Sequence, residues 1–78
     1  MRPLSEYREL TPEALDALEQ AVRDHRRIAL RRRGTEYVVV AVRLETGDRD
    51  ERLAGRLPMT GEVLSFNLRE LETFTVLP

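Results

Sequence analysis

Two groups of charged residues are the strongest candidates for binding chemistry in this 78-residue chain. The first lies between Arg23 and Arg33, where six arginines and one aspartate give a net charge of +5. Because arginine holds a phosphate group through a two-pronged fork, this cluster suggests contact with RNA or DNA. The residues that this hypothesis assigns to nucleic-acid binding are Arg26, Arg27, Arg31 and Arg33. The plainer interpretation is solvated strand ends paired with nearby acids, since no aromatic residue is interleaved for base stacking and the whole chain has a net charge of −1.

The second group is acidic and consists of Glu13, Asp16 and Glu19. If this segment is a helix, the three carboxylates fall outside its apolar stripe and form an exposed acidic face. Such a face suits a basic partner, whereas a charged helix face taken alone is usually only solvated.

The residue types needed for catalysis or metal binding are scarce. With no cysteine and His25 as the single histidine, the chain lacks the ligands of a usual zinc site and has no disulfide or thiol nucleophile. We expect His25 at a helix C-terminus, beside the last carbonyl groups. Ser5 and Ser65 lack the context of a nucleophile elbow, and no glycine cluster resembles a phosphate-binding loop. We therefore expect no enzyme activity, no cofactor and no metal.

The run 36–44 predicts the central strand, since seven of its nine residues are apolar or aromatic and four are valine. Alternation predicts two faces. One face would carry Val38, Val40, Val42 and Leu44. The other would carry Tyr37, Val39, Ala41 and Arg43. Because both faces are largely apolar, we expect a long strand in a small, strongly bent sheet.

Before this strand, the pattern predicts a helix at about 12–25. Thr11 is a good N-cap, Pro12 suits the first helical position, and Leu10 with Leu15 forms a hydrophobic staple. Leu15, Leu18 and Val22 recur at helical spacing, so this stripe should lie on the sheet.

The remaining pattern predicts short antiparallel strands joined by tight turns, within one domain covering 1–78. The strands are expected at about 27–33, 36–45, 51–58, 62–68 and 73–77, with a helical turn at 69–71. Gly34-Thr35 and Gly47-Asp48 mark turns, and Gly55 marks a bend or bulge in a strand. The predicted fold class is α+β, mainly β, with the N-terminal helix packed on a small five-stranded antiparallel barrel, because closure removes exposed edges.

The order of these elements resembles the Rho-binding antiterminators (the Rof or YaeO family), which have a helix on an Sm-like barrel of the SH3-like type. The residues that carry the resemblance are Tyr7, Leu10, Glu13, Asp16, Leu18-Glu19-x-Ala21, His25, Ile28-x-Leu30, Gly34 and the ending Leu68-Arg69-Glu70-Leu71-Glu72-Thr73-Phe74. The resemblance implies a protein that binds the transcription termination factor Rho at its RNA-binding region and blocks RNA loading. Glu13, Asp16 and Glu19 would then compete with phosphate for a basic surface.

Two other hypotheses stay open. An Sm-like nucleic-acid-binding module would use the arginine cluster to hold RNA. The run Arg31-Arg32-Arg33-Gly34, followed by Tyr37-Val38-Val39-Val40, also resembles the hairpin of Phd/YefM-type antitoxins, which are dimeric DNA-binding proteins.

We expect a cytoplasmic protein without a membrane partner. The first residues lack the apolar segment of a signal peptide, and no apolar run approaches the ~20 residues that span a bilayer. The sequence leaves the oligomeric state open, since a small barrel is found both as a monomer and in rings.

Overall fold

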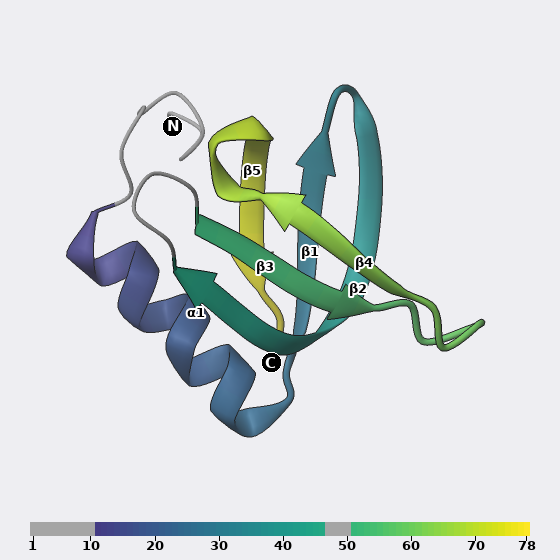
Figure 1. Cartoon of the computed structure of the whole chain (residues 1–78), viewed down its shortest axis with the longest axis horizontal. Helices are drawn as coiled ribbons and strands as arrows, with labels where there is room; N and C mark the ends of the chain where they lie inside the picture. Colours follow the sequence, from purple (N-terminus) through teal and green to yellow (C-terminus); the bar gives the residue numbers. More distant parts are fainter. Residues whose placement is uncertain (1–10, 47–50) are drawn as a thin grey trace.

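The computed structural model describes residues 11–46 and 51–78 and shows one helix followed by a five-stranded antiparallel sheet (Figure 1). The elements are α1 (Pro12–Asp24), β1 (Arg27–Arg32), β2 (Thr35–Thr46), β3 (Glu51–Arg56), β4 (Val63–Asn67), the 3-10 turn η2 (Leu68–Glu70) and β5 (Leu71–Val76). The predicted fold class, α+β and mainly β, is confirmed. Three predicted features lie outside the described residues: Tyr7 of the family resemblance, Leu10 of the hydrophobic staple and the turn at Gly47-Asp48.

Helix α1 begins as its sequence predicts. The Thr11 hydroxyl accepts a hydrogen bond from the Ala14 backbone N–H at 3.1 Å, and Pro12 occupies the first turn. The helix ends one residue earlier than predicted, because His25 adopts the left-handed conformation with φ 54°. The backbone N–H of His25 donates to the carbonyls of Ala21 and Val22, so the main chain of His25 forms the cap.

The strands are ordered β4-β3-β2-β1-β5, and each pair is antiparallel. β1 and β2 form a hairpin whose last pair is Arg32 opposite Thr35, with Arg33 and Gly34 as its two-residue loop. Both loop residues have positive φ, 52° and 78°, as the twist of a two-residue hairpin favours. The predicted turn at Gly34-Thr35 was therefore wrong by one residue, since Thr35 already belongs to the ladder.

β2 contains a bulge that changes which side chains face inward. Up to Ala41 the alternation holds, with Val39 and Ala41 fully buried and Val38 exposed. The register with β3 shifts between Ala41 and Arg43, so one extra residue is accommodated on β2. Arg43 therefore lies exposed and Leu44 packs against the core. The predicted grouping of Arg43 with Val39, and of Leu44 with Val38, was wrong beyond the bulge.

The core lies between α1 and the inner face of the bent sheet. In Figure 1, β4 crosses in front of β1 and β2, and η2 joins the two edge strands β4 and β5. The buried cluster consists of Leu18, Ala21, Ile28, Leu30, Val39, Ala41, Leu53, Phe66, Leu68 and Leu71. The apolar stripe of the helix thus fills the inside of the sheet, as expected.

Gly55 serves close packing in β3 and lies directly beside the bulge of β2. Gly55 lies opposite Ala41 on β2 and Leu64 on β4, and the register with β2 shifts directly after this pair, because Ala54 lies opposite Arg43. A Cβ atom at Gly55 would lie 2.5 Å from Cγ2 of Val39, a distance that side chains do not reach without displacement. The bulge predicted at Gly55 does lie beside it, but its extra residue is on β2, and the glycine itself makes room for the side chain of Val39 on the inner face.

Candidate binding surfaces

The acidic helix face, defined as Glu13, Asp16 and Glu19, lies exposed on α1, away from the buried Ala14 and Leu18. At 100° per residue, the three carboxylates spread over about 120° of the helix surface. None of them forms an ion pair or hydrogen bond with another residue of the described ranges. Within 11–46 and 51–78, this face is therefore a cluster of uncompensated negative charge.

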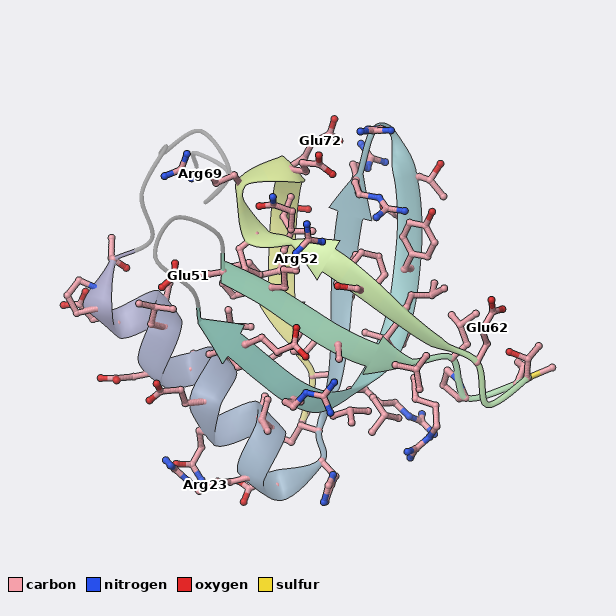
Figure 2. The ribbon with its side chains drawn as sticks, in the orientation of Figure 1. Arg23, Glu51, Arg52, Glu62, Arg69 and Glu72 are labelled. Atoms are coloured by element: carbon pink, nitrogen blue, oxygen red, sulfur yellow. The ribbon has the colours of Figure 1, made fainter. Side chains whose placement is uncertain are left out.

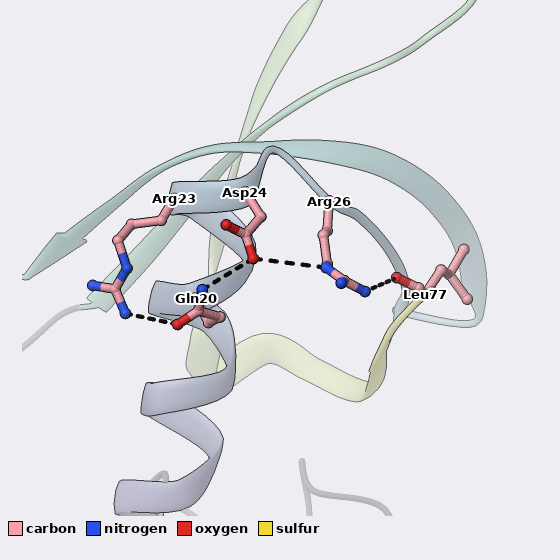
Figure 3. A network of polar contacts seen from close by, with 5 residues as sticks. All are labelled: Gln20, Arg23, Asp24, Arg26 and Leu77. Carbon is pink, nitrogen blue, oxygen red and sulfur yellow. Dashed lines mark hydrogen bonds and ion pairs between the residues drawn. The ribbon is translucent and has the colours of Figure 1, made fainter.

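The C-terminal end of α1 carries a polar network instead (Figure 3). Gln20 donates to the Asp24 carboxylate at 3.0 Å and accepts from the Arg23 guanidinium at 2.9 Å. Arg26 lies 3.9 Å from the same Asp24 carboxylate and donates to the Leu77 carbonyl at 3.4 Å. Arg26 thus links the helix end to the last residues of the chain. Its exposed ion pair adds little stability.

The predicted arginine cluster does not form one patch. Arg26 and Arg27 stand at the beginning of β1, whereas Arg31 and Arg33 stand at its hairpin end. A strand rises by about 3.3 Å per residue, so Arg27 and Arg33 are separated by roughly 20 Å along the strand. The structure does not bring the four predicted nucleic-acid ligands together.

Acidic neighbours pair with the arginines at the hairpin end. Arg31 lies 3.2 Å from the Glu36 carboxylate on the facing strand, and Arg33 lies 3.5 Å from the Glu70 carboxylate of η2. This arrangement is the one that the plainer interpretation of the cluster predicts. Arg27 differs, because its side chain has no ion pair or hydrogen bond within 11–46 and 51–78.

Arg32 has a structural position that sequence reasoning missed. Its guanidinium carbon lies 4.9 Å from the ring centroid of Phe66 and 5.5 Å from that of Tyr37. The two rings meet edge to face, with centroids 5.2 Å apart. Arg32 therefore caps the core with a cation over aromatic faces. The alternation of side chains along β1 could have indicated this position. Ile28, Leu30 and Arg32 are two residues apart from one another and therefore point to the same, inner side of the sheet.

Two further arginines that the sequence hypothesis did not include, Arg52 and Arg56, project from β3 without a charged partner among the described residues. Arg69 of η2 is likewise exposed (Figure 2 labels Arg52 and Arg69). Their spatial neighbours follow from the strand register, which the sequence alone does not supply.

A shallow hollow of about 250 Å³ lies between α1 and the end of β5. Its lining consists of Ala17, Gln20, Ala21, Asp24, Arg26 and Val76. It is open to solvent and holds the ion pair of Asp24 and Arg26 described above. In the described part of the chain, no three His, Asp or Glu side chains gather as a metal site would require. No helix there has the length and apolar character to cross a membrane.

Comparison with known proteins gives one likeness at the level of structure. No protein-family model and no curated protein matches the chain. Among solved structures, the chain is similar to proteasome accessory factor B/C (PafBC) of Arthrobacter aurescens, with a TM-score of 0.69 and 25% sequence identity. The match covers 90% of this chain but only 12% of the PafBC chain. This chain therefore resembles a small portion of a much larger protein.

Proposed function

We propose that this chain is a non-catalytic regulatory binding protein that uses its acidic helix face against a basic protein surface. The supporting observation is that Glu13, Asp16 and Glu19 are exposed together without an ion pair to any described residue. Uncompensated charges on one rigid element attract an oppositely charged surface at long range and set its orientation. They lie opposite the apolar stripe, so binding leaves the core untouched.

The partner that we propose is transcription termination factor Rho, on the resemblance to the Rho-binding antiterminators. A surface that binds RNA must be basic to hold phosphates, and a row of carboxylates on a helix competes for the same cations. Occupation of that surface would block RNA loading. A partner of this kind would make this a cytoplasmic protein.

The nucleic-acid hypothesis draws less support from the geometry. Arg31 and Arg33 pair with Glu36 and Glu70, so RNA would have to replace these contacts. Direct binding of RNA to this protein would appear as heat when single-stranded RNA is titrated into the protein alone.

The test is calorimetric titration of the protein into the RNA-binding domain of Rho at moderate salt, with single-stranded RNA as competitor. We expect saturable binding that RNA displaces. Asp16→Arg, in the middle of the acidic helix face, should weaken this binding at least tenfold, because it places a cation against a basic surface.

The matched control is Glu62→Arg, which makes the same charge change. Glu62 is exposed and lies at the opposite end of the molecule from α1 (Figure 2). Equal weakening by both variants would show that only net charge matters and would contradict the proposal. Absence of heat from a sample that circular dichroism shows to be folded would also overturn it.

A further inference from the structure

The outer face of the sheet carries exposed arginine and valine side chains, on elements other than α1. Four residues on neighbouring strands lie in one row across it: Arg27 on β1, Val40 on β2, Arg56 on β3 and Val63 on β4. Directly opposed residues of antiparallel strands point to the same side of the sheet. Because Val39 is fully buried on the inner side, this row faces outward.

Two valines on this face are exposed, and the topology explains the exposure of Val38. Val38 is 44% exposed and Val63 is 54% exposed. β3 ends at Arg56, opposite Val40, so the part of β2 that contains Val38 has no β3 neighbour. We call Arg27, Val38, Val40, Arg56 and Val63 the arginine–valine face.

The two arginines of this face have no charged partner in the described part of the chain. The cross-strand neighbours of Arg56 are Val40 and Val63, and the β2 neighbour of Arg27 is Val40. Neither guanidinium has an ion pair or hydrogen bond within 11–46 and 51–78. Arg43, farther along β2, is instead 2.8 Å from the Glu45 carboxylate. The strand register thus places one arginine on each side of Val40.

The chemistry of this face selects a partner with aliphatic and acidic groups. Exposed valines favour burial against apolar side chains, and each free guanidinium accommodates a carboxylate through two parallel hydrogen bonds. Nucleic acid fits less well, because the described aromatic rings Tyr37, Phe66 and Phe74 pack in or against the core and leave none for base stacking.

We propose that the arginine–valine face binds an acidic amphipathic helix of a partner protein. Arg27 and Arg56 are two strand spacings apart, about 10 Å between Cα atoms. A helix with its side chains is about 10–12 Å wide, so one lying along β2 would set its aliphatic stripe on Val38 and Val40. Carboxylates on its two flanks would then meet Arg27 on one side and Arg56 on the other.

The shape of the proposed ligand excludes α1 of a second copy as the occupant. The exposed side of α1 is acidic, but its aliphatic residues Leu18 and Ala21 are fully buried in its own core. An extended acidic segment fits poorly, since alternate side chains of a strand point to opposite sides.

The probe is a synthetic helical peptide with a leucine stripe flanked on both sides by glutamates, titrated into the full chain and followed by fluorescence anisotropy. Arg27→Glu and Arg56→Glu should each weaken binding about tenfold, and Val38→Ser should weaken it severalfold. Arg69→Glu is the matched control, because Arg69 is exposed on η2 and the charge change is identical. It should leave binding within twofold of wild type.

Three results would overturn the proposal. The first is equal loss of binding in Arg56→Glu and Arg69→Glu, which would mean non-specific attraction. The second is tighter binding of an oligouridine than of the peptide. The third is a dimer in sedimentation of the free protein that Arg56→Glu dissociates, which would make a second copy the occupant. Circular dichroism of each variant establishes that the fold is retained.

Discussion

Gly55 shows how one missing Cβ atom determines local packing on the inner face. We expect Gly55→Ala to lower the free energy of unfolding by about 1–3 kcal/mol, the usual cost of overpacking a core. The added atom would lie 2.5 Å from Cγ2 and 2.8 Å from Cβ of Val39. Urea denaturation measures the change.

The same site offers a double-mutant test. Val39→Ala removes the atoms in conflict, so Gly55→Ala should cost less in that background, with a favourable coupling of at least about 0.5 kcal/mol. Strict additivity of the two changes would show that the contact does not limit the packing at Gly55.

Arg32 is the second residue whose environment predicts a measurable effect. Its guanidinium lies over both Phe66 and Tyr37, and cation–π contacts contribute about 0.5–2 kcal/mol depending on exposure. Arg32→Ala should therefore destabilise the fold by about 1–2 kcal/mol in urea denaturation. Arg31→Ala is the control, because its ion pair with Glu36 is exposed and should be worth less than about 1 kcal/mol. Equal destabilisation by the two changes would contradict the assigned role of Arg32.

At the scale of the element, the C-terminus of α1 holds a conformation that suits glycine better than histidine. His25 has φ 54°, and the left-handed region costs a residue with a Cβ atom about 1–2 kcal/mol. His25→Gly should keep the backbone hydrogen bonds of the cap and raise the free energy of unfolding by about 1 kcal/mol, measured as a higher urea midpoint. Asp24→Gly, one residue earlier and inside α1, should instead lower it, because glycine is less favourable in a helix and the change removes the carboxylate that accepts from Gln20 and pairs with Arg26. A lower midpoint for His25→Gly would mean that the imidazole itself stabilises the helix end.

The elements were predictable from the sequence because their signals are local. The N-cap at Thr11, the apolar stripe of α1 and the valine run of β2 predicted the helix and the central strand close to their observed limits. The failures at Arg43 and Leu44 have a cause outside the local pattern, since the bulge depends on the partner strand β3. The bulge expected at Gly55 lies beside it, but its extra residue is on β2 and the close contact of the glycine is with Val39, so neither could be assigned from the local pattern.

Of the candidate binding surfaces, the acidic helix face could be predicted from local sequence, whereas the neighbours of the arginines could not. Exposure of Glu13, Asp16 and Glu19 followed from helical periodicity alone. The ion-pair partner of each arginine could not be predicted without the strand register. Arg33, for example, pairs with Glu70, a residue 37 positions away. The position of Arg56 beside Val40 could be recognised only from the order of β2, β3 and β4 in the sheet.

At the scale of the whole molecule, the two proposed surfaces carry opposite charge on different elements. The acidic helix face lies on α1, whereas the arginine–valine face lies on the outer side of β1 to β4. A net charge of −1 therefore conceals two local fields of opposite sign, and each should attract its own partner.

This separation predicts that the two binding reactions are independent. Asp16→Arg should weaken binding to the RNA-binding domain of Rho and leave binding of the acidic helical peptide within twofold of wild type. Arg56→Glu should have the converse effect, and the double variant should show the product of the single effects, because sites without shared partners contribute additively. Titration of each variant with both ligands measures this directly. A variant that weakens both reactions while remaining folded would mean that the two faces form parts of one surface, since only a shared partner would couple charges on α1 to charges on the outer sheet.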